Sequence, residues 1–281
     1  KDWRVGVYFN IAHNENKITE MPDNYIEENY TFGNGNYAYR REEGRPMGSF
    51  YGYRYKGVYQ NKDATYARDI EGNVMKDISG NAIVMRNGSY TVAPGDAIYE
   101  DVNHDGVINQ YDIVYLGNSN PRLTGGAGLN VSYKQFKLSA IFYGRYGQDV
   151  VNATRLNNES MRGIDNQSTA VLRRWRNEGD QTDIPRALYG EGYNTLGSDR
   201  FVEDASYLRL KSLSFTYRLP KKAIQRWGFN NIDVYVTGYN LFTWTNYTGQ
   251  DPEVKTENTY AKDTATTPAS IQLVAGFNLS F

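Results

Sequence analysis

The sequence has no cysteine, only two histidines and almost no net charge. Its 281 residues carry 31 Lys and Arg against 32 Asp and Glu, which gives a formal net charge of −1. Without cysteine there is no disulfide and no thiol chemistry, which fits an oxidising compartment and also many cytosolic proteins. The neutral balance argues against a nucleic-acid partner, because nucleic-acid binders usually carry a basic excess.

Long apolar runs are missing as well, so the sequence predicts no transmembrane helix, which needs about 18 or more apolar residues in a row. The mean hydropathy of −0.68 still leaves a membrane β-barrel open, because only alternate residues of each barrel strand need be apolar. The chain has no signal peptide and opens inside a strand pattern, so we expect an internal or C-terminal piece of a longer protein.

The sequence does have strict alternation of apolar with polar or small residues. Five stretches show it clearly, namely 2–11, 124–133, 136–147, 232–245 and 269–281. Since successive side chains of a strand point to opposite faces, each stretch predicts a strand with one apolar face. These strands are long against the typical length of about 5–6 residues and suit a tilted crossing of a bilayer.

A sixth stretch, 206–219, alternates well only in its second half. Arg209 and Lys211 occupy the apolar parity in the first half. We therefore expect a β-bulge there, or an exit from the apolar zone.

Charged residues in the five clear strands all avoid the apolar parity; they are Asp2, Arg4, Lys137, Arg145 and Asp233. A charge facing lipid at mid-bilayer costs about 2–4 kcal/mol, whereas a water-filled lumen tolerates it. A barrel explains this segregation, and a soluble β-sandwich with one buried face explains it too.

The connections favour the barrel. Only Lys134 and Gln135 join the second and third strands, and a short helix is predicted between Pro220 and Gly228 in the next turn. The other three connections are long: 14–123, 148–205 and 246–267. Short turns alternating with long loops are typical of outer-membrane barrels, with the long loops outside the cell. We therefore predict an all-β fold, a transmembrane antiparallel β-barrel.

Segment 101–112, "DVNHDGVINQYD", resembles a calcium-binding loop. It offers oxygen ligands at the expected spacing from Asp101, Asn103, Asp105, Val107 (backbone carbonyl), Asn109 and Asp112, with Gly106 at the turn. Asp at the last position resembles dockerin-type loops rather than the helix–loop–helix consensus. We predict a structural Ca²⁺ site in an extracellular loop; the alternative is a loop of Asx turns without metal.

Catalytic constellations are not apparent. Neither His13 nor His104 has an obvious catalytic partner, and the glycines at 32–36 lack the lysine and helix of a phosphate-binding loop. We expect no enzymatic activity.

Several long blocks resemble a known family. They are "GRPMGSFYGYRYKGVYQN" (44–61), 94–147, 198–254 and the terminal "GFNLSF". These blocks are similar to the C-terminal barrel half of SusC/RagA-type TonB-dependent transporters. The resemblance implies a 22-stranded barrel with an N-terminal plug, energised by the TonB complex, and a SusD-like surface lipoprotein as a lid. It also implies import of oligosaccharides or peptides across the outer membrane of a Gram-negative bacterium.

On this reading, 1–281 is the C-terminal portion of the barrel, without the plug and the earlier strands. Phe281 resembles the terminal aromatic residue that serves as a membrane-assembly signal. Two open sheet edges in lipid would be prohibitive, so the partners include the remainder of the same barrel as well as outer-membrane lipid. We expect loop tyrosines and Asn or Asp side chains to line the substrate chamber.

Two rival functions remain at this stage. One is a soluble, calcium-dependent β-sandwich that binds carbohydrate, which requires a closed core. The other is an enzymatic outer-membrane barrel, which requires a catalytic constellation facing the lumen.

Overall fold

The computed structural model describes residues 2–22, 35–38, 40–257 and 260–281. Parts of the predicted loops 14–123 and 246–267, at 23–34, 39 and 258–259, lie outside the described residues. In the described part of the chain, no helix is long and apolar enough to cross a membrane.

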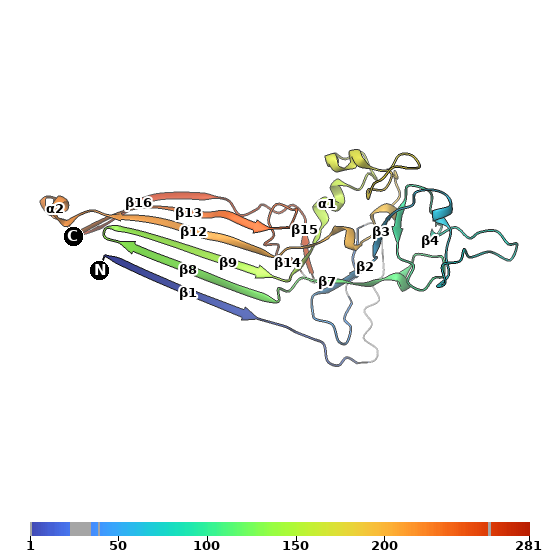
Figure 1. Cartoon of the computed structure of the whole chain (residues 1–281), viewed down its shortest axis with the longest axis horizontal. Coiled ribbons are helices and arrows are strands. Elements are labelled where there is room, and N and C mark those ends of the chain that lie inside the picture. The colour runs from blue at the N-terminus through green and yellow to red at the C-terminus, as the bar shows by residue number, and fades with distance from the viewer. Residues whose placement is uncertain (1, 23–34, 39, 258–259) are drawn as a thin grey trace.

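One long antiparallel sheet of six strands dominates the molecule (Figure 1). Its order is β1-β8-β9-β12-β13-β16, and each neighbouring pair is antiparallel. The strands are β1 (Trp3–His13), β8 (Leu123–Tyr133), β9 (Phe136–Tyr146), β12 (Tyr207–Arg218), β13 (Asn231–Thr245) and β16 (Gln272–Ser280). Each predicted strand is therefore present within a few residues of its expected bounds, and the all-β class is confirmed.

Two short connections close one end of the sheet. Lys134 and Gln135 form the turn between β8 and β9, with Lys134 at a φ of 51°. The helical turn α2 (Lys221–Ile224) and the 3-10 turn η6 (Gln225–Trp227) follow Pro220 and end at Gly228, whose φ of 77° is left-handed. Both chain termini lie at this end of the sheet (Figure 1).

The bulge expected in 206–219 is present at Lys211. Leu210 is opposite Phe142 of β9 whereas Ser212 is opposite Ile141, so Lys211 is the extra residue of β12. One extra residue reverses the parity of the strand. Arg209 consequently points to the opposite face from Leu213, although both residue numbers are odd.

The two faces of the sheet differ sharply. One face is apolar and uncovered among the described residues: the side chains of Phe9 and Leu273 are 79% and 74% exposed. The other face carries the charged side chains and polar pairs such as Ser139 with Asn130, whose Oγ–Oδ1 distance is 2.6 Å. We call these the outer face and the inner face.

The three long connections gather at the other end of the sheet and fold together (Figure 1). Three small sheets have two strands each: β2 (Ser49–Gly52) with β7 (Val114–Asn118), β3 (Tyr55–Val58) with β6 (Ala97–Tyr99), and β4 (Arg86–Asn87) with β5 (Tyr90–Thr91). A fourth small sheet has the order β11 (Val202–Asp204), β10 (Asp149–Asn152), β15 (Tyr260–Asp263) and β14 (Thr256–Glu257). Helical turns are α1 (Ala153–Asn158), η1 (Asp63–Thr65), η2 (Gln110–Asp112), η3 (Thr169–Arg173), η4 (Tyr193–Thr195) and η5 (Asp199–Phe201).

A buried carboxylate ties the first two long connections to each other. Asp96 is fully buried, and its carboxylate accepts hydrogen bonds from Arg186 Nε at 2.7 Å and Tyr90 Oη at 2.6 Å. Asn194 adds a third donor at 3.2 Å. A buried charge is tolerated only when it is paired and hydrogen-bonded in this way. A tyrosine-rich apolar cluster surrounds this centre; it contains Tyr53, Tyr59, Tyr99, Tyr193, Ile108, Met85 and Leu196.

Gly95 allows the close packing beside this centre. Its φ is +89°, and a Cβ at this position would lie 2.3 Å from Trp175 Cε3. Gly72 has a similar φ of +86° but no atom within 4 Å of the same position. Gly95 therefore carries a steric constraint that Gly72 does not.

Gly95→Ala should destabilise the folded loops by about 1–3 kcal/mol more than Gly72→Ala, because it adds overpacking to the shared left-handed strain. The temperature at which segment 90–190 becomes sensitive to protease measures the difference. Equal losses in the two variants would contradict the packing assigned to Trp175.

Candidate functional site

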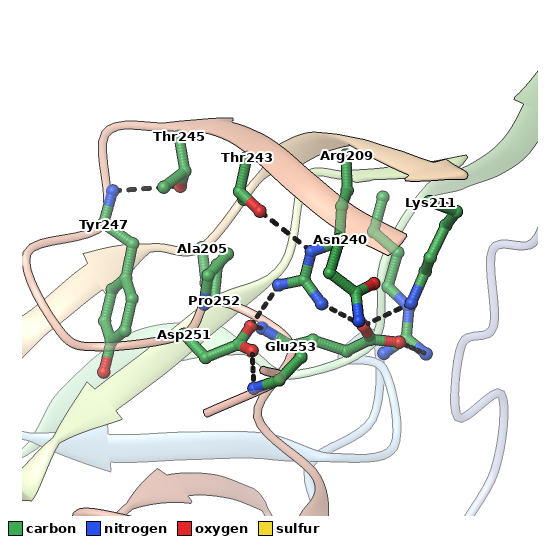
Figure 2. A network of polar contacts seen from close by, with 12 residues as sticks. Ala205, Arg209, Lys211, Asn240, Thr243, Thr245, Tyr247, Asp251, Pro252 and Glu253 are labelled. Carbon is green, nitrogen blue, oxygen red and sulfur yellow. Dashed lines mark hydrogen bonds and ion pairs between the residues drawn. The ribbon is translucent and has the colours of Figure 1, made fainter. Parts of the chain in front are cut away.

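The candidate site is a cluster of ionic side chains on the inner face, at the end nearer the long connections. β12 supplies Arg209 and Lys211, and the loop after β13 supplies Asp251 and Glu253 (Figure 2). β9 supplies Arg145. We call these five residues the inner ionic cluster. Sequence analysis noted the unusual parity of Arg209 and Lys211 but did not connect them to any carboxylate.

Arg209 is the centre of the inner ionic cluster, and its side chain is only 3% exposed. It donates from Nη1 to Glu253 Oε2 at 2.9 Å, from Nη2 to Asp251 Oδ1, and from Nε to Thr243 Oγ1 at 2.9 Å (Figure 2). Planar guanidinium donors suit this arrangement of two carboxylates and a hydroxyl. The bulge at Lys211 is what directs Arg209 to the inner face.

Two further cations reach the same carboxylate. Lys211 Nζ lies 3.0 Å from Glu253 Oε2, and Arg145 Nη2 lies 3.8 Å from Glu253 Oε1. Both cations also lie near the ring of Tyr143, at 5.7 Å and 5.9 Å from its centroid. The sheet therefore places three cations, from β9 and β12, against the two carboxylates of the loop after β13.

Asp251 is held by backbone donors as well as by Arg209. Burial of Asp251 opposes its charge, but the N–H groups of Ala269 and Glu253 and the guanidinium of Arg209 outweigh this and lower the pKa of Asp251. A lowered folded pKa means that the charged state stabilises the fold at neutral pH. This stabilisation is fully present above the pKa of Asp251 in the unfolded chain and is lost as the pH falls from there through the lowered folded pKa.

The inner ionic cluster fixes the last long connection against the sheet. Asp251 bonds Ala269 ahead of β16, and Gln148 Nε2 donates to the carbonyl oxygens of Ala205 and Pro252 at 3.0 Å and 3.2 Å. Tyr247 Oη donates to Asp263 Oδ2 at 2.6 Å. The loop is thus held at both its beginning and its end.

A polar cavity of about 960 Å³ lies beside the inner ionic cluster. Its lining includes Tyr143, Lys255, Lys262, Thr266 and Asn120. An aromatic ring with hydroxyl, amide and ammonium groups suits a polar solute such as a sugar or a peptide. The expectation of tyrosine and Asn or Asp side chains near the substrate is compatible with this lining and stays a prediction.

The predicted calcium loop is folded into a compact turn beside β4, where Val107 forms a parallel bridge with Arg86. Gly106 has a φ of 79°, and Asp101 accepts hydrogen bonds from the N–H groups of Asp105 and Gly106 at 3.2 Å and 2.8 Å. Asp105 Oδ1 in turn accepts from Val107 N–H at 2.8 Å. Asn103 Nδ2 donates to Asp105, and Asn109 Nδ2 donates to the Val107 carbonyl.

The donor set of this loop fits a calcium ion only in part. Asp112 is fully buried, and its two oxygens accept from Val102 N–H and Asn109 N–H at 2.8 Å each. Its pKa is raised by burial, and the charges of Asp101 and Asp105 act in the same direction. Across the described ranges, no group of three or more His, Asp or Glu side chains is placed to hold a metal ion. The calcium interpretation therefore stays a prediction.

Phe281 lies at the end of the sheet that carries α2. Its ring is 4.8 Å from the ring of Phe229, centroid to centroid, and the residue is 81% exposed. His13 and His104 lie far apart in the sequence; their Nδ1 atoms face the backbone carbonyls of Arg122 and Arg68, at 2.9 Å and 3.3 Å.

Arg209→Ala should release the loop at 246–255, because Asp251 loses its cation in a partly buried position. We expect a cost of about 3 kcal/mol, the lower end of the range for breaking a buried pair. The matched control is Arg218→Ala on the same strand, whose 61% exposed side chain pairs with Asp233 and should contribute about 0–1 kcal/mol. The rate of backbone hydrogen exchange in 246–255 measures the effect of each variant on the loop. Equal exchange rates in the two variants would contradict the anchoring role of Arg209.

Comparison with known proteins connects this geometry to a family. No family model matches the chain. The chain is 32% identical over 265 residues to TonB-dependent receptor P3 of Formosa agariphila, covering 92% of this chain and 24% of the relative. It is 27% identical over 290 residues to TonB-dependent receptor SusC of Bacteroides thetaiotaomicron, covering 100% of this chain and 25% of SusC.

Solved structures agree with these relatives. The RagAB peptide transporter matches with a TM-score of 0.69 at 27% identity, over 100% of this chain and 28% of that chain. The RagAB peptide importer in its closed-closed state matches with a TM-score of 0.67 at 26% identity. The resemblance to SusC/RagA-type TonB-dependent transporters is confirmed, and the chain spans about a quarter of the length of these relatives. Their names are those of receptors and transporters rather than enzymes, in agreement with the expectation of no catalytic activity.

Proposed function

We propose that this chain is the C-terminal part of the barrel of a SusC/RagA-type TonB-dependent transporter in the outer membrane of a Gram-negative bacterium. The six-stranded sheet is a section of the barrel wall, its outer face meets lipid and its inner face meets the lumen. The three long connections form part of the extracellular mouth. The whole transporter imports oligosaccharides or peptides with a SusD-like surface lipoprotein and energy from the TonB complex.

The main support for the proposal is that apolar side chains lie on one face of the sheet and charged side chains on the other. Large apolar side chains cover the outer face from edge to edge of the sheet; they include Val7, Phe9, Phe215, Val236, Phe242, Leu273 and Phe277. Charged side chains of the six strands, such as Arg209 and Asp233, lie on the inner face. This division matches a solvent of hydrocarbon on one side and water on the other.

A soluble β-sandwich fits the structure less well. Such a domain packs a second sheet against its apolar face at about 10 Å. Among the described residues, the other strands gather beyond one end of the six-stranded sheet and leave its apolar face uncovered (Figure 1).

The free edges of the sheet support a larger assembly. Within the described residues, β1 pairs only with β8 and β16 pairs only with β13. Unpaired backbone groups in hydrocarbon cost several kcal/mol each. Strands from the remainder of the barrel would satisfy both edges.

The inner ionic cluster and the adjacent polar cavity support a role in handling solute. They lie on the proposed lumen side of the wall, close to the loops of the proposed mouth. In this position the inner ionic cluster would keep the loop at 246–267 fixed against the wall, beside the path of the solute. The polar lining of the cavity is compatible with both a glycan and a peptide.

Leu273→Arg tests which face meets lipid. Leu273 is opposite Gly238, near the middle of β13, and lies on the outer face. We expect the Arg variant to lose about 2–4 kcal/mol of stability in the membrane and to accumulate less folded protein in the outer-membrane fraction. Val274→Arg is the matched control, because Val274 is the next residue and lies on the inner face opposite Thr237. A defect as large in the control would contradict the assigned faces.

For segment 101–112 we keep a structural Ca²⁺ site as a subordinate proposal. Its support is the oxygen-rich loop around Gly106, in a position outside the cell where calcium is plentiful. Asp101→Ala combined with Asp105→Ala should remove any calcium-dependent protection of 95–120 from protease. Asp77→Ala is the control, since Asp77 holds a similar tight turn through Ser79 and Asn81 without a calcium-loop pattern. If EDTA never changes cleavage of the unaltered protein, the loop holds no metal.

The terminal residue is part of the same proposal. Phe281 would act as the signal read by the machinery that inserts barrels into the outer membrane. Its exposed ring at the end of the sheet farthest from the loops is compatible with that role.

A further inference from the structure

The outer face contains a furrow over the loop ends of β8 and β9, whose lining extends from β1 to β13. From the loop end, the outward side chains of β8 are Leu123, Gly125, Ala127 and Leu129. Gly144 of β9 lies directly opposite Gly125 and removes a second side chain from the same place. Three small residues on two neighbouring strands thus leave the backbone uncovered near the loop end of an otherwise bulky apolar face.

Large side chains flank the furrow on both sides. Phe9 and Ile11 of β1 stand opposite Ala127 and Gly125, and they are 79% and 69% exposed. On the other side stand Phe142 of β9, Leu208 of β12 and Trp244 of β13, with the rings of Phe142 and Trp244 6.5 Å apart. The hollow between these walls has a volume of about 870 Å³.

The furrow is built into the backbone rather than into movable side chains. A Cβ at Gly125 would lie 2.7 Å from the carbonyl oxygen of Asn10, and one at Gly144 would lie 2.9 Å from that of Tyr207. Real Cβ atoms do not approach a backbone oxygen so closely without a shift of the strand. Glycine at both positions therefore allows the tight approach of the strands and leaves the floor open.

All the walls belong to this chain. The furrow is bounded by β1, β9, β12 and β13, so its shape does not depend on strands beyond the two free edges. The guanidinium of Arg145, whose backbone lines the floor, points through to the inner face and Glu253. Asp204, Ser206 and Asn246 lie at the loop end of the furrow, and its lining also includes Asn10, Thr124, Thr243 and Thr245, which occupy inner-face positions of their strands.

We propose that this furrow binds part of one acyl chain of a membrane lipid. The inference rests on the proposed function, which makes the outer face the lipid-facing surface, and it adds an ordered lipid site to that surface. The furrow is continuous with the apolar face of the sheet, which the proposed function places against lipid. Its floor carries no charge, and its polar end lies where the headgroups would be.

The chemistry of the furrow favours an acyl chain over an added strand. A strand would bring backbone polar groups that the floor cannot satisfy, because the N–H and C=O groups of β8 and β9 already pair within the sheet. An acyl chain has only methylene groups to place against Gly125, Ala127 and the aromatic wall. Close packing of methylene against apolar atoms is the gain available in a medium without water.

The experiment uses the complete transporter in phosphatidylcholine vesicles that contain a small fraction of phosphatidylcholine with a diazirine on one acyl chain. After illumination, mass spectrometry locates the labelled peptides. We expect labelling of 123–127 and 142–146 to exceed severalfold that of other outer-face segments such as 129–133 and 273–279. Ala127→Trp, which fills the furrow, should lower the excess severalfold. Val131→Trp, on the same face of the same strand, should leave it unchanged.

The outcomes separate this inference from the proposed function. Even labelling over the whole outer face would overturn the furrow as a site while leaving the lipid-facing assignment intact. No labelling of any outer-face segment would overturn both. Should Ala127→Trp fail to assemble, Ala127→Leu gives a smaller filling, and unchanged labelling in that assembled variant would also overturn the inference.

Discussion

The division of apolar and charged side chains between two faces of one sheet is the constraint on which the rest of the structure depends. Each of the six strands keeps its apolar side chains on the outer face, and in β12, where alternation by residue number fails, one extra residue at Lys211 restores the division. Any register slip of one residue would place charges among apolar side chains. In the proposed lipid-facing wall such an error would be costly, and the division would then select the register, the bulge and the facing of every strand.

The charged side chains of the six strands lie on the inner face, where several of them form ion pairs with loop residues. Arg209 is buried because two carboxylates from a loop distant in sequence reach it, and the loop is ordered because Arg209 is there. The buried Asp96 performs a similar role within the first two long connections. The wall and the loops are therefore held by a few well-paired charges, and this arrangement leaves a polar cavity between them.

Sequence reasoning predicted most of the sheet because alternation is a local signal. The six strands, the turn at Lys134 and the helical stop at Gly228 all follow from residues within a dozen positions. The unusual parity of Arg209 also predicted the bulge. The inner ionic cluster escaped prediction because Asp251 and Glu253 follow Arg209 by 42 and 44 residues, and no local sequence pattern identifies Arg209 as their partner. The furrow escaped it for a similar reason, since Gly125 and Gly144 become neighbours only through the strand register.

The most direct test of the lipid-facing wall is an accessibility scan along β9 in the complete transporter. This chain has no native cysteine, so single cysteines at 136–146 can carry a spin label in bilayers. Even-numbered positions should contact oxygen dissolved in lipid, and odd-numbered positions should contact a water-soluble nickel reagent. Equal contact of both parities with the nickel reagent would contradict a wall between lipid and water.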